Sequence, residues 1–228
     1  MTTVTCTRAA AVAESRRMDR RFLLVAAAVA ALCFAVGLAG LDRPLAEWVR
    51  ASGLENARFF VWGLAALDVV SGLRLWIVAL PWAAILIGTI ALRSAKRTRL
   101  GYALIAAGLV QTAAIETMIS AKDIFARLRP FKVFEAGDWS HVWFAGGDSF
   151  PSGHSAFYFG LLLPLASACP IRWLRALLVA IPVFVVLARI DMAKHFLSDV
   201  SASALMVSIY ALVAAWLTAR WLPPPARA

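Results

Sequence analysis

Long apolar runs separated by short charged clusters form the pattern of this chain. Six runs predict membrane-crossing helices, at residues 22–41, 73–92, 100–119, 155–169, 173–187 and 196–217. The fourth and fifth runs form only about 22 Å of helix, which is shorter than the roughly 30 Å hydrocarbon core. We therefore predict an all-α, polytopic membrane protein in which these two helices end at headgroup depth on one side.

The stretch between the first two runs has a different pattern. Residues 42–72 alternate charged and apolar positions, and aromatic side chains lie among the charges. This pattern predicts one or two short helices lying at the membrane interface. The apolar part of the stretch, residues 59–67, is too short to cross the bilayer.

Composition and charge support a membrane protein. Hydrophobic residues make up 62% of the 228-residue chain and charged residues only 16%, whereas soluble domains are about 45–50% apolar. The net charge of +10 comes from short arginine clusters between apolar runs, not from a basic face, so we expect no nucleic-acid partner. Three cysteines, at positions 6, 33 and 169, have neither metal-binding spacing nor a disulfide framework.

The basic clusters also predict orientation and domain limits. Residues 93–99 carry four basic side chains, which the positive-inside rule assigns to the cytoplasm. We therefore expect a cytoplasmic tail at 1–21, one membrane domain at 22–221 with an outer loop at 122–154, and a second cytoplasmic tail at 222–228. The basic start followed by an apolar run is similar to a signal peptide, but the run is long enough to span, which favours an uncleaved anchor.

One stretch between two apolar runs carries a candidate nucleophile. If the chain is helical from His195 onward, Asp199 lies four residues later on the same face and can orient the imidazole. Arg189 precedes them with a permanently charged guanidinium suited to phosphate oxygens. The alternative is an ordinary charged helix end next to the membrane.

A second stretch carries two cations. Lys122 and Arg129 are seven residues apart, which would place them two turns apart on one helix face, and Pro130 is expected to end the helix after Arg129. Both cations would then point at one location. The alternative is a basic cap that extends from the end of the third apolar run toward the interface.

A third stretch, beginning at Pro151, predicts a turn that opens a helix. The free N–H groups of a helix start bind anions, and Gly153 allows backbone to approach a ligand closely. Ser152 offers a hydroxyl group and His154 a proton. The alternative is a helix start that Ser152 simply caps.

Together the three stretches fit phosphoryl transfer without a metal or other cofactor. The cations and N–H groups would neutralise the phosphate oxygens while one histidine attacks and the other protonates the leaving oxygen. No acidic pair or Cys/His cluster offers a divalent-metal site. A non-enzymatic carrier that only binds anions or lipids remains an alternative from a different class.

The spacing of these residues resembles the three signature motifs of the type 2 phosphatidic acid phosphatase superfamily, which also contains the vanadium haloperoxidases. The resemblance covers residues 122–199 and departs from the usual pattern at Ala188, where the family usually has serine. It implies that His195 forms a phosphohistidine, that Asp199 orients it, and that His154 is the general acid and then the base. The phosphate ligands that it implies are Lys122, Arg129, Ser152, Gly153 and Arg189.

The resemblance implies a phosphatase that acts on a lipid phosphate monoester or diphosphate. The small size and the Ala/Arg-rich composition favour a bacterial inner membrane, and the predicted order of spans places the three stretches at its periplasmic face. Phosphatidic acid, phosphatidylglycerol phosphate, undecaprenyl diphosphate and lipid A phosphates are all candidates, and the oligomeric state is open. A phosphotransferase of the same fold is an alternative. A haloperoxidase is disfavoured because those enzymes are soluble and this chain is predicted to have six spans.

Other polar and aromatic residues near these stretches have more ordinary interpretations. A carboxylate inside a span is costly, so we expect Glu116 to pair with a basic group near the site. His141 is expected to be a solvated loop residue. Trp139, Trp143 and Phe144 predict an interfacial aromatic belt, with a lid over the lipid phosphate as the alternative.

Overall fold

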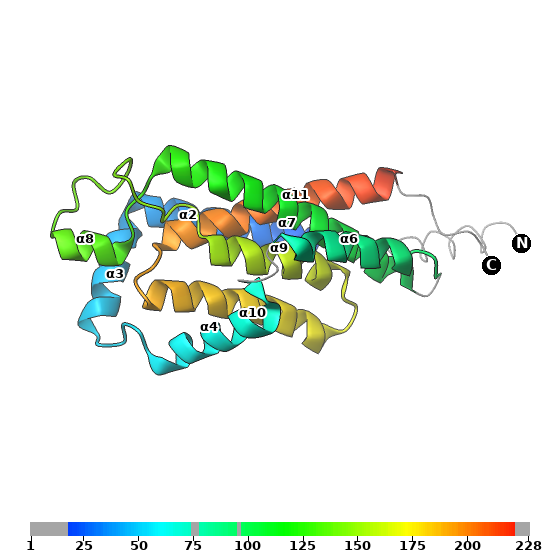
Figure 1. Cartoon of the computed structure of the whole chain (residues 1–228), viewed down its shortest axis with the longest axis horizontal. Helices are drawn as coiled ribbons and strands as arrows, with labels where there is room; N and C mark the ends of the chain where they lie inside the picture. The colour runs from blue at the N-terminus through cyan, green and yellow to red at the C-terminus, as the bar shows by residue number, and fades with distance from the viewer. Residues whose placement is uncertain (1–17, 74–77, 95–96, 222–228) are drawn as a thin grey trace, which may run out of the picture.

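The chain is helical wherever its structure is described. The computed structural model describes residues 18–73, 78–94 and 97–221, so most of the first predicted tail and all of the second lie outside the described residues. The helices are α2 (Arg20–Val36), η1 (Gly37–Leu41), α3 (Asp42–Ala51), α4 (Arg58–Ser71), α6 (Ala79–Ala91), α7 (Thr98–Phe125), α8 (Pro130–Ala136), α9 (Gly153–Ala168), α10 (Arg172–Asp191) and α11 (Leu197–Trp221). The all-α prediction is confirmed for these residues, and Figure 1 shows the long helices arranged as a bundle.

Several of these helices are suited to a membrane. Four stretches are long and apolar enough to cross it: Arg20–Ala51, Thr98–Ala136, Arg172–Asp191 and Leu197–Thr218. By contrast, α6 has 13 described helical residues and α9 has 16. The protein is therefore an integral membrane protein, while the count of six spans stays a prediction.

The first span differs from its predicted form because it bends directly into α3. The bend is a short π-helix, η1, in which Gly40 has a φ of 133°, a value that strongly favours glycine. Residues 42–51 therefore continue the first helix around a kink and do not follow it through a loop. The second helix of the predicted interfacial stretch, α4, packs along α10 (Figure 1).

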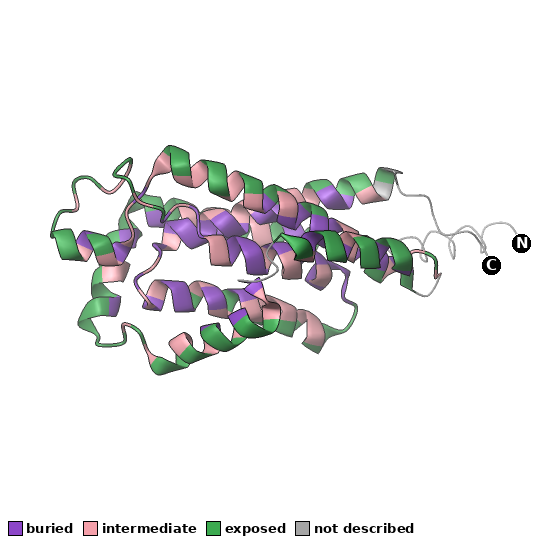
Figure 2. Cartoon of the chain, in the orientation of Figure 1, coloured by how far each residue is buried: buried purple, intermediate pink, exposed green. Residues whose placement is uncertain are grey.

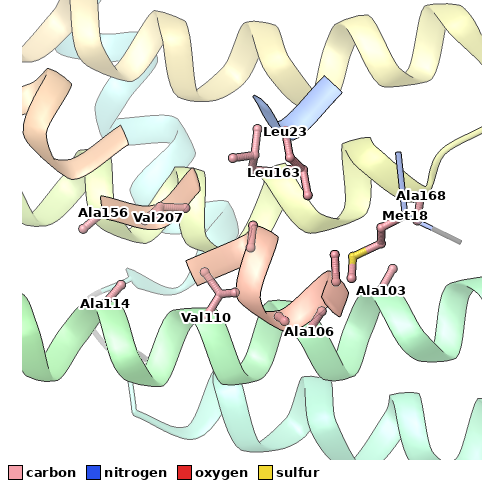
Figure 3. Close-up of a cluster of buried hydrophobic side chains, with 13 residues drawn as sticks. Met18, Leu23, Ala103, Ala106, Val110, Ala114, Ala156, Leu163, Ala168 and Val207 are labelled. Carbon is pink, nitrogen blue, oxygen red and sulfur yellow. The ribbon is translucent and has the colours of Figure 1, made fainter. Parts of the chain in front are cut away.

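Small side chains fill the main core between α2, α7, α9 and α11. Their small size lets these helices approach closely, which is how helices associate when the surrounding lipid is as apolar as the core. Large apolar side chains face outward instead, including Leu32 on α2, Trp82 on α6 and Leu187 on α10. Figure 2 shows the buried positions gathered on the inward sides of the helices. The core residues labelled in Figure 3 are Met18, Leu23, Ala103, Ala106, Val110, Ala114, Ala156, Leu163, Ala168 and Val207.

A second core attaches α4 to the bundle. Leu64 of α4 packs with Phe157 of α9 and Val185 of α10, and all three side chains are almost fully buried.

Backbone contacts join several helix ends at the end of the bundle that carries α8 (Figure 1). They connect the α7–α8 segment to the α10–α11 turn, and the start of α9 to α11. The amide of Phe131 donates to the carbonyl of Ala193 at 3.1 Å. Four helix ends therefore meet where the sequence analysis placed its motifs.

Candidate active site

The turn between α10 and α11 folds back onto the end of α10. The backbone amides of Lys194 and His195 donate to the carbonyl oxygen of Arg189, at 3.1 and 3.2 Å. Ala193 has a φ of 50°, in the left-handed region, which lets the chain reverse direction within a few residues. His195 is consequently buried, with 2% of its surface exposed.

The hydrogen bond at Nδ1 fixes the tautomer of His195. Nδ1 lies 2.8 Å from the carbonyl oxygen of Ser149, and because a carbonyl can only accept, Nδ1 carries the hydrogen. Burial lowers the pKa of His195 to about 3, helped by the charge of Arg189 and opposed by Asp199. The imidazole is therefore neutral at pH 7, and its lone pair is on Nε2, where a nucleophile needs it.

The relation between His195 and Asp199 differs from the predicted helical pair. Because α11 begins at Leu197, His195 lies before the helix. The closest carboxylate oxygen of Asp199 is 3.7 Å from Nδ1. That oxygen instead accepts from the hydroxyl of Ser149 at 2.6 Å and from the amide of Phe196 at 2.8 Å. Asp199 therefore contacts the histidine mainly through Ser149, which the sequence analysis did not identify.

A buried arginine that the sequence analysis also missed holds this arrangement. Arg127 donates through Nη1 to Asp199 at 2.5 Å and to the hydroxyl of Ser198 at 2.6 Å, and through Nη2 to Asp42 at 2.8 Å. Asp42, on α3, also accepts from the backbone amide of Ser198 at 2.9 Å, and so caps the start of α11. The guanidinium lies 4.2 Å from the ring centres of both Trp143 and Phe196.

Lys122 and Arg129 meet, but not on one helix face as predicted. The helix α7 ends at Phe125, and Pro130 begins α8 and does not end a helix. Both cations instead contact Asp148. Arg129 donates from Nε at 2.8 Å and from Nη2 at 2.6 Å to the two carboxylate oxygens, and Lys122 donates to the backbone carbonyl.

Asp148 is therefore an anion held against two predicted phosphate ligands. Burial opposes its ionisation, but the hydrogen bonds and charge of Arg129, together with the charge of Lys122 and a smaller electrostatic contribution from His195, outweigh burial and lower the pKa of Asp148. Its side chain remains 57% exposed. The carboxylate is thus ionised at neutral pH, and it binds the guanidinium in the same bidentate geometry that a phosphate group uses.

Arg189 is the most buried of the three cations among the predicted phosphate ligands, with 7% of its surface exposed. Its Nε has no hydrogen-bond partner within the part of the chain that the structure describes. Arg129 lies close enough to repel it, and Asp68 and Asp148 close enough to attract it. A buried guanidinium nitrogen without an acceptor is suited to an anionic ligand.

The Pro151 turn opens α9 as predicted. Ser152 is the N-cap, and its side chain accepts from the amide of Ser155 at 3.4 Å. The amide of Ser152 donates to the carbonyl of Asp199 at 3.2 Å, which attaches this turn to α11. Gly153 is the first helical residue, and a Cβ there would lie 3.7 Å from Met118, an ordinary contact distance.

His154 is joined to α4. Its Nε2 lies 3.2 Å from a carboxylate oxygen of Asp68, and its side chain is 27% exposed. The structure thus gathers Lys122, Arg129 and Arg189 as electrostatic neighbours, with Lys122 and Arg189 also next to His195. His154 is linked to this group through Asp68, a charged neighbour of Arg189.

The remaining predicted residues lie outside this group. Glu116 is exposed on α7 and has no salt bridge within the described part of the chain. The expected pairing of Glu116 with a basic group near the site is therefore not found among these residues. His141 is an exposed loop residue, as predicted. Phe144 is exposed, whereas Trp143 and Trp139 are partly buried, over Arg127 and Arg43 respectively, and do not form a simple outward belt. Ala188, where the motif departs from its usual serine, is fully buried.

Comparison with known proteins identifies the family. The family model described as the PAP2 superfamily matches residues 96–224, which is more than half of the chain. Searches of the curated proteins and of the solved structures found no match. The matched region contains all three motifs, although the two carboxylates Asp42 and Asp68 lie before it. This chain belongs to the PAP2 superfamily, which contains phosphatases acting on phosphate esters.

Proposed function

We propose that the protein is a metal-independent lipid phosphatase of a bacterial inner membrane, with its site at the periplasmic face. The observation that carries this proposal is the tautomer of His195, which leaves the lone pair on Nε2 of an imidazole that has Lys122 and Arg189 as charged neighbours. The family supports phosphate-ester hydrolysis. The apolar helices favour a substrate that is itself in the membrane.

In the first half of the proposed reaction, Nε2 of His195 attacks phosphorus as the bond to the lipid oxygen breaks. His154, protonated, gives its proton to that leaving oxygen. Lys122, Arg129 and Arg189, with the free amides at the start of α9, balance the charge on the phosphate oxygens. The carbonyl of Ser149 keeps the imidazole in place through Nδ1–H.

In the second half, His154 is neutral and takes a proton from water. The water oxygen attacks phosphorus, the nitrogen–phosphorus bond breaks, and His195 regains its lone pair as inorganic phosphate leaves. The positive charge that the phosphohistidine ring carries between the two steps is balanced by Asp199, 3.7 Å from Nδ1. Transfer to a lipid or sugar hydroxyl would use the same steps with a different acceptor.

Asp148 has a defined place in this proposal. It contacts both Lys122 and Arg129, two cations that the phosphate would use. The incoming phosphate therefore has to displace this carboxylate. Because the side chain is more than half exposed and belongs to a loop, it can rotate away without unpacking the core.

A substrate panel tests the proposal. Purified protein in detergent is given phosphatidic acid, phosphatidylglycerol phosphate, undecaprenyl diphosphate and lipid A, and phosphate release is measured. We expect release from at least one lipid, and a loss of at least about 100-fold in the His195→Ala and His154→Ala variants. The exposed loop histidine serves as a matched control, because His141→Ala should retain the wild-type rate.

Two inhibitor experiments separate this mechanism from others. Orthovanadate should inhibit because it mimics five-coordinate phosphorus, and chelation of divalent ions should leave the rate unchanged. Wild-type phosphate release by His195→Ala would disprove the nucleophile. Binding of lipid phosphate without turnover of any substrate would instead favour the carrier alternative.

A further inference from the structure

Helix α4 carries a buried carboxylate to the candidate site. Asp68 lies outside the region that matches the family and is 8% exposed. It follows Leu64 by one helical turn, so both project from the same face, which packs against the second core. A carboxylate in such surroundings is costly unless its oxygens accept hydrogen bonds, so its partners are informative.

Both oxygens of this carboxylate contact α9. One lies 3.2 Å from Nε2 of His154, and the other accepts from the hydroxyl of Tyr158 at 3.0 Å. His154 and Tyr158 are four residues apart, so a single carboxylate bridges two consecutive turns of one helix face. The hydroxyl of Tyr158 is also 3.0 Å from the hydroxyl of Ser71, at the end of α4.

The chemistry of this contact fixes one nitrogen of His154. An ionised carboxylate only accepts, so the hydrogen between the two groups is on Nε2 of the imidazole. Proton exchange with any other partner then has to take place at Nδ1. The same contact fixes the ring's orientation, as the aspartate of a Ser-His-Asp triad does for its histidine.

We infer that Asp68 is a positioning residue that holds His154 so that Nδ1 delivers the proton to the leaving oxygen and later receives one from water. This inference rests on the proposed function, in which His154 is the general acid. Help from a general acid matters most when the leaving oxygen is strongly basic, as in an alkyl phosphate monoester. It matters much less for an aryl phosphate, whose leaving oxygen is stable without a proton.

A comparison of leaving groups tests this role. Turnover is measured for phosphatidic acid and for 4-nitrophenyl phosphate with wild type, Asp68→Asn and His154→Ala. We expect His154→Ala to lower kcat on the alkyl substrate by about 10²- to 10⁴-fold, and on the aryl substrate by far less. Asp68→Asn should show the same selectivity at roughly 10- to 100-fold, the range known for residues that orient metal-binding histidines, with little change in KM.

Asp191 provides a matched control for the placement of α4. It is another buried carboxylate, and it accepts from the amide of Ala57, the N-cap of α4, at 3.0 Å. Asp191→Asn therefore disturbs the same helix without touching His154. Any loss it causes should be equal for the two substrates, because a shifted helix has no reason to discriminate between leaving groups.

A conservative variant keeps the inference testable if Asp68→Asn does not fold. Asp68→Glu keeps the charge but displaces the acceptor, and a misplacement on the order of 1 Å is enough to lower catalysis. Its alkyl-to-aryl rate ratio should therefore move toward that of His154→Ala. An unchanged ratio in a folded Asp68 variant, while His154→Ala is selective, would overturn the inference. Loss of selectivity in His154→Ala would instead overturn the general acid of the proposed function.

Discussion

Replacing Arg127 by methionine would leave two buried carboxylates without the cation they share. The side chain of Arg127 is 5% exposed, and its partners Asp42 and Asp199 are 11% and 0% exposed. Breaking a buried ion pair by removing one partner costs about 3–5 kcal/mol. For a domain of this size each kcal/mol corresponds to roughly 2–4 °C, so we expect the melting temperature of Arg127→Met to fall by roughly 6–20 °C.

Thermal unfolding followed by tryptophan fluorescence, in one detergent for all variants, measures this effect. Arg43→Met is the matched control, because Arg43 pairs with Glu47 on α3 at 2.8 Å with side chains 59% and 45% exposed. Exposed pairs contribute about 0.2–1 kcal/mol, which corresponds to at most about 4 °C. A melting temperature of Arg127→Met within the range of this control would refute the reasoning.

A second substitution tests whether the loss comes from unpaired charge. Adding Asp42→Asn to Arg127→Met removes one orphaned carboxylate and keeps an oxygen that can accept from the amide of Ser198. The double variant should therefore lose less stability than the sum of the two single variants. Simple additivity would mean that the two side chains do not interact.

Three further predictions concern the same end of the bundle. Asp148→Asn removes the carboxylate charge that competes with the substrate phosphate for Lys122 and Arg129. In steady-state kinetics, KM for the lipid phosphate should therefore fall by up to about fivefold. A higher KM would show that Asp148 does not compete with the phosphate. Because burial lowers the pKa of His195 to about 3 in the folded protein, from an ordinary value of 6.5, the unfolded chain binds its proton first as the pH falls. As the pH falls from about 6.5 to 3, the melting temperature of the wild type should therefore fall more steeply than that of His195→Ala. Equal dependence of the two melting temperatures on pH would count against a buried neutral imidazole. A Cβ on Gly147 would lie 2.1 Å from the carbonyl oxygen of Arg127, whereas one on Gly153 would meet only ordinary contacts, so Gly147→Ala should lower the melting temperature and Gly153→Ala should not.

The helices and the motif residues could be predicted from the sequence for simple reasons. Apolar runs locate membrane helices because lipid contact requires apolar side chains along a helix's length. Lys122, Arg129 and Arg189 stood out because each is a cation at the edge of an apolar run, at a spacing that matches a known set of motifs. Helix boundaries were less accurate, since the end of α7 and the start of α8 depend on local turns near Ala126 and Pro130.

The residues that support the motifs could not be predicted. Arg127 looks like any other arginine near a membrane interface, and its carboxylate partners are 72 and 85 residues away in the chain. Nor does the sequence alone indicate that the start of α11 is capped by Asp42, which is 156 residues from Ser198. Such contacts exist only once the helices are packed together. His195 and Asp199 do lie 3.7 Å apart, but not as the predicted pair on one helix face, because α11 begins after the histidine.

The positions of Asp42 and Asp68 bear on how this kind of enzyme can be divided or recombined. Both precede residue 96, where the family match begins, yet one caps α11 and binds Arg127 while the other contacts His154. A fragment that starts at residue 96 would contain every signature motif and still lack both carboxylates. We therefore expect the motif-bearing helices not to form an autonomous catalytic module, and a chimera that exchanges the N-terminal helices to need an acidic residue at each of these two positions.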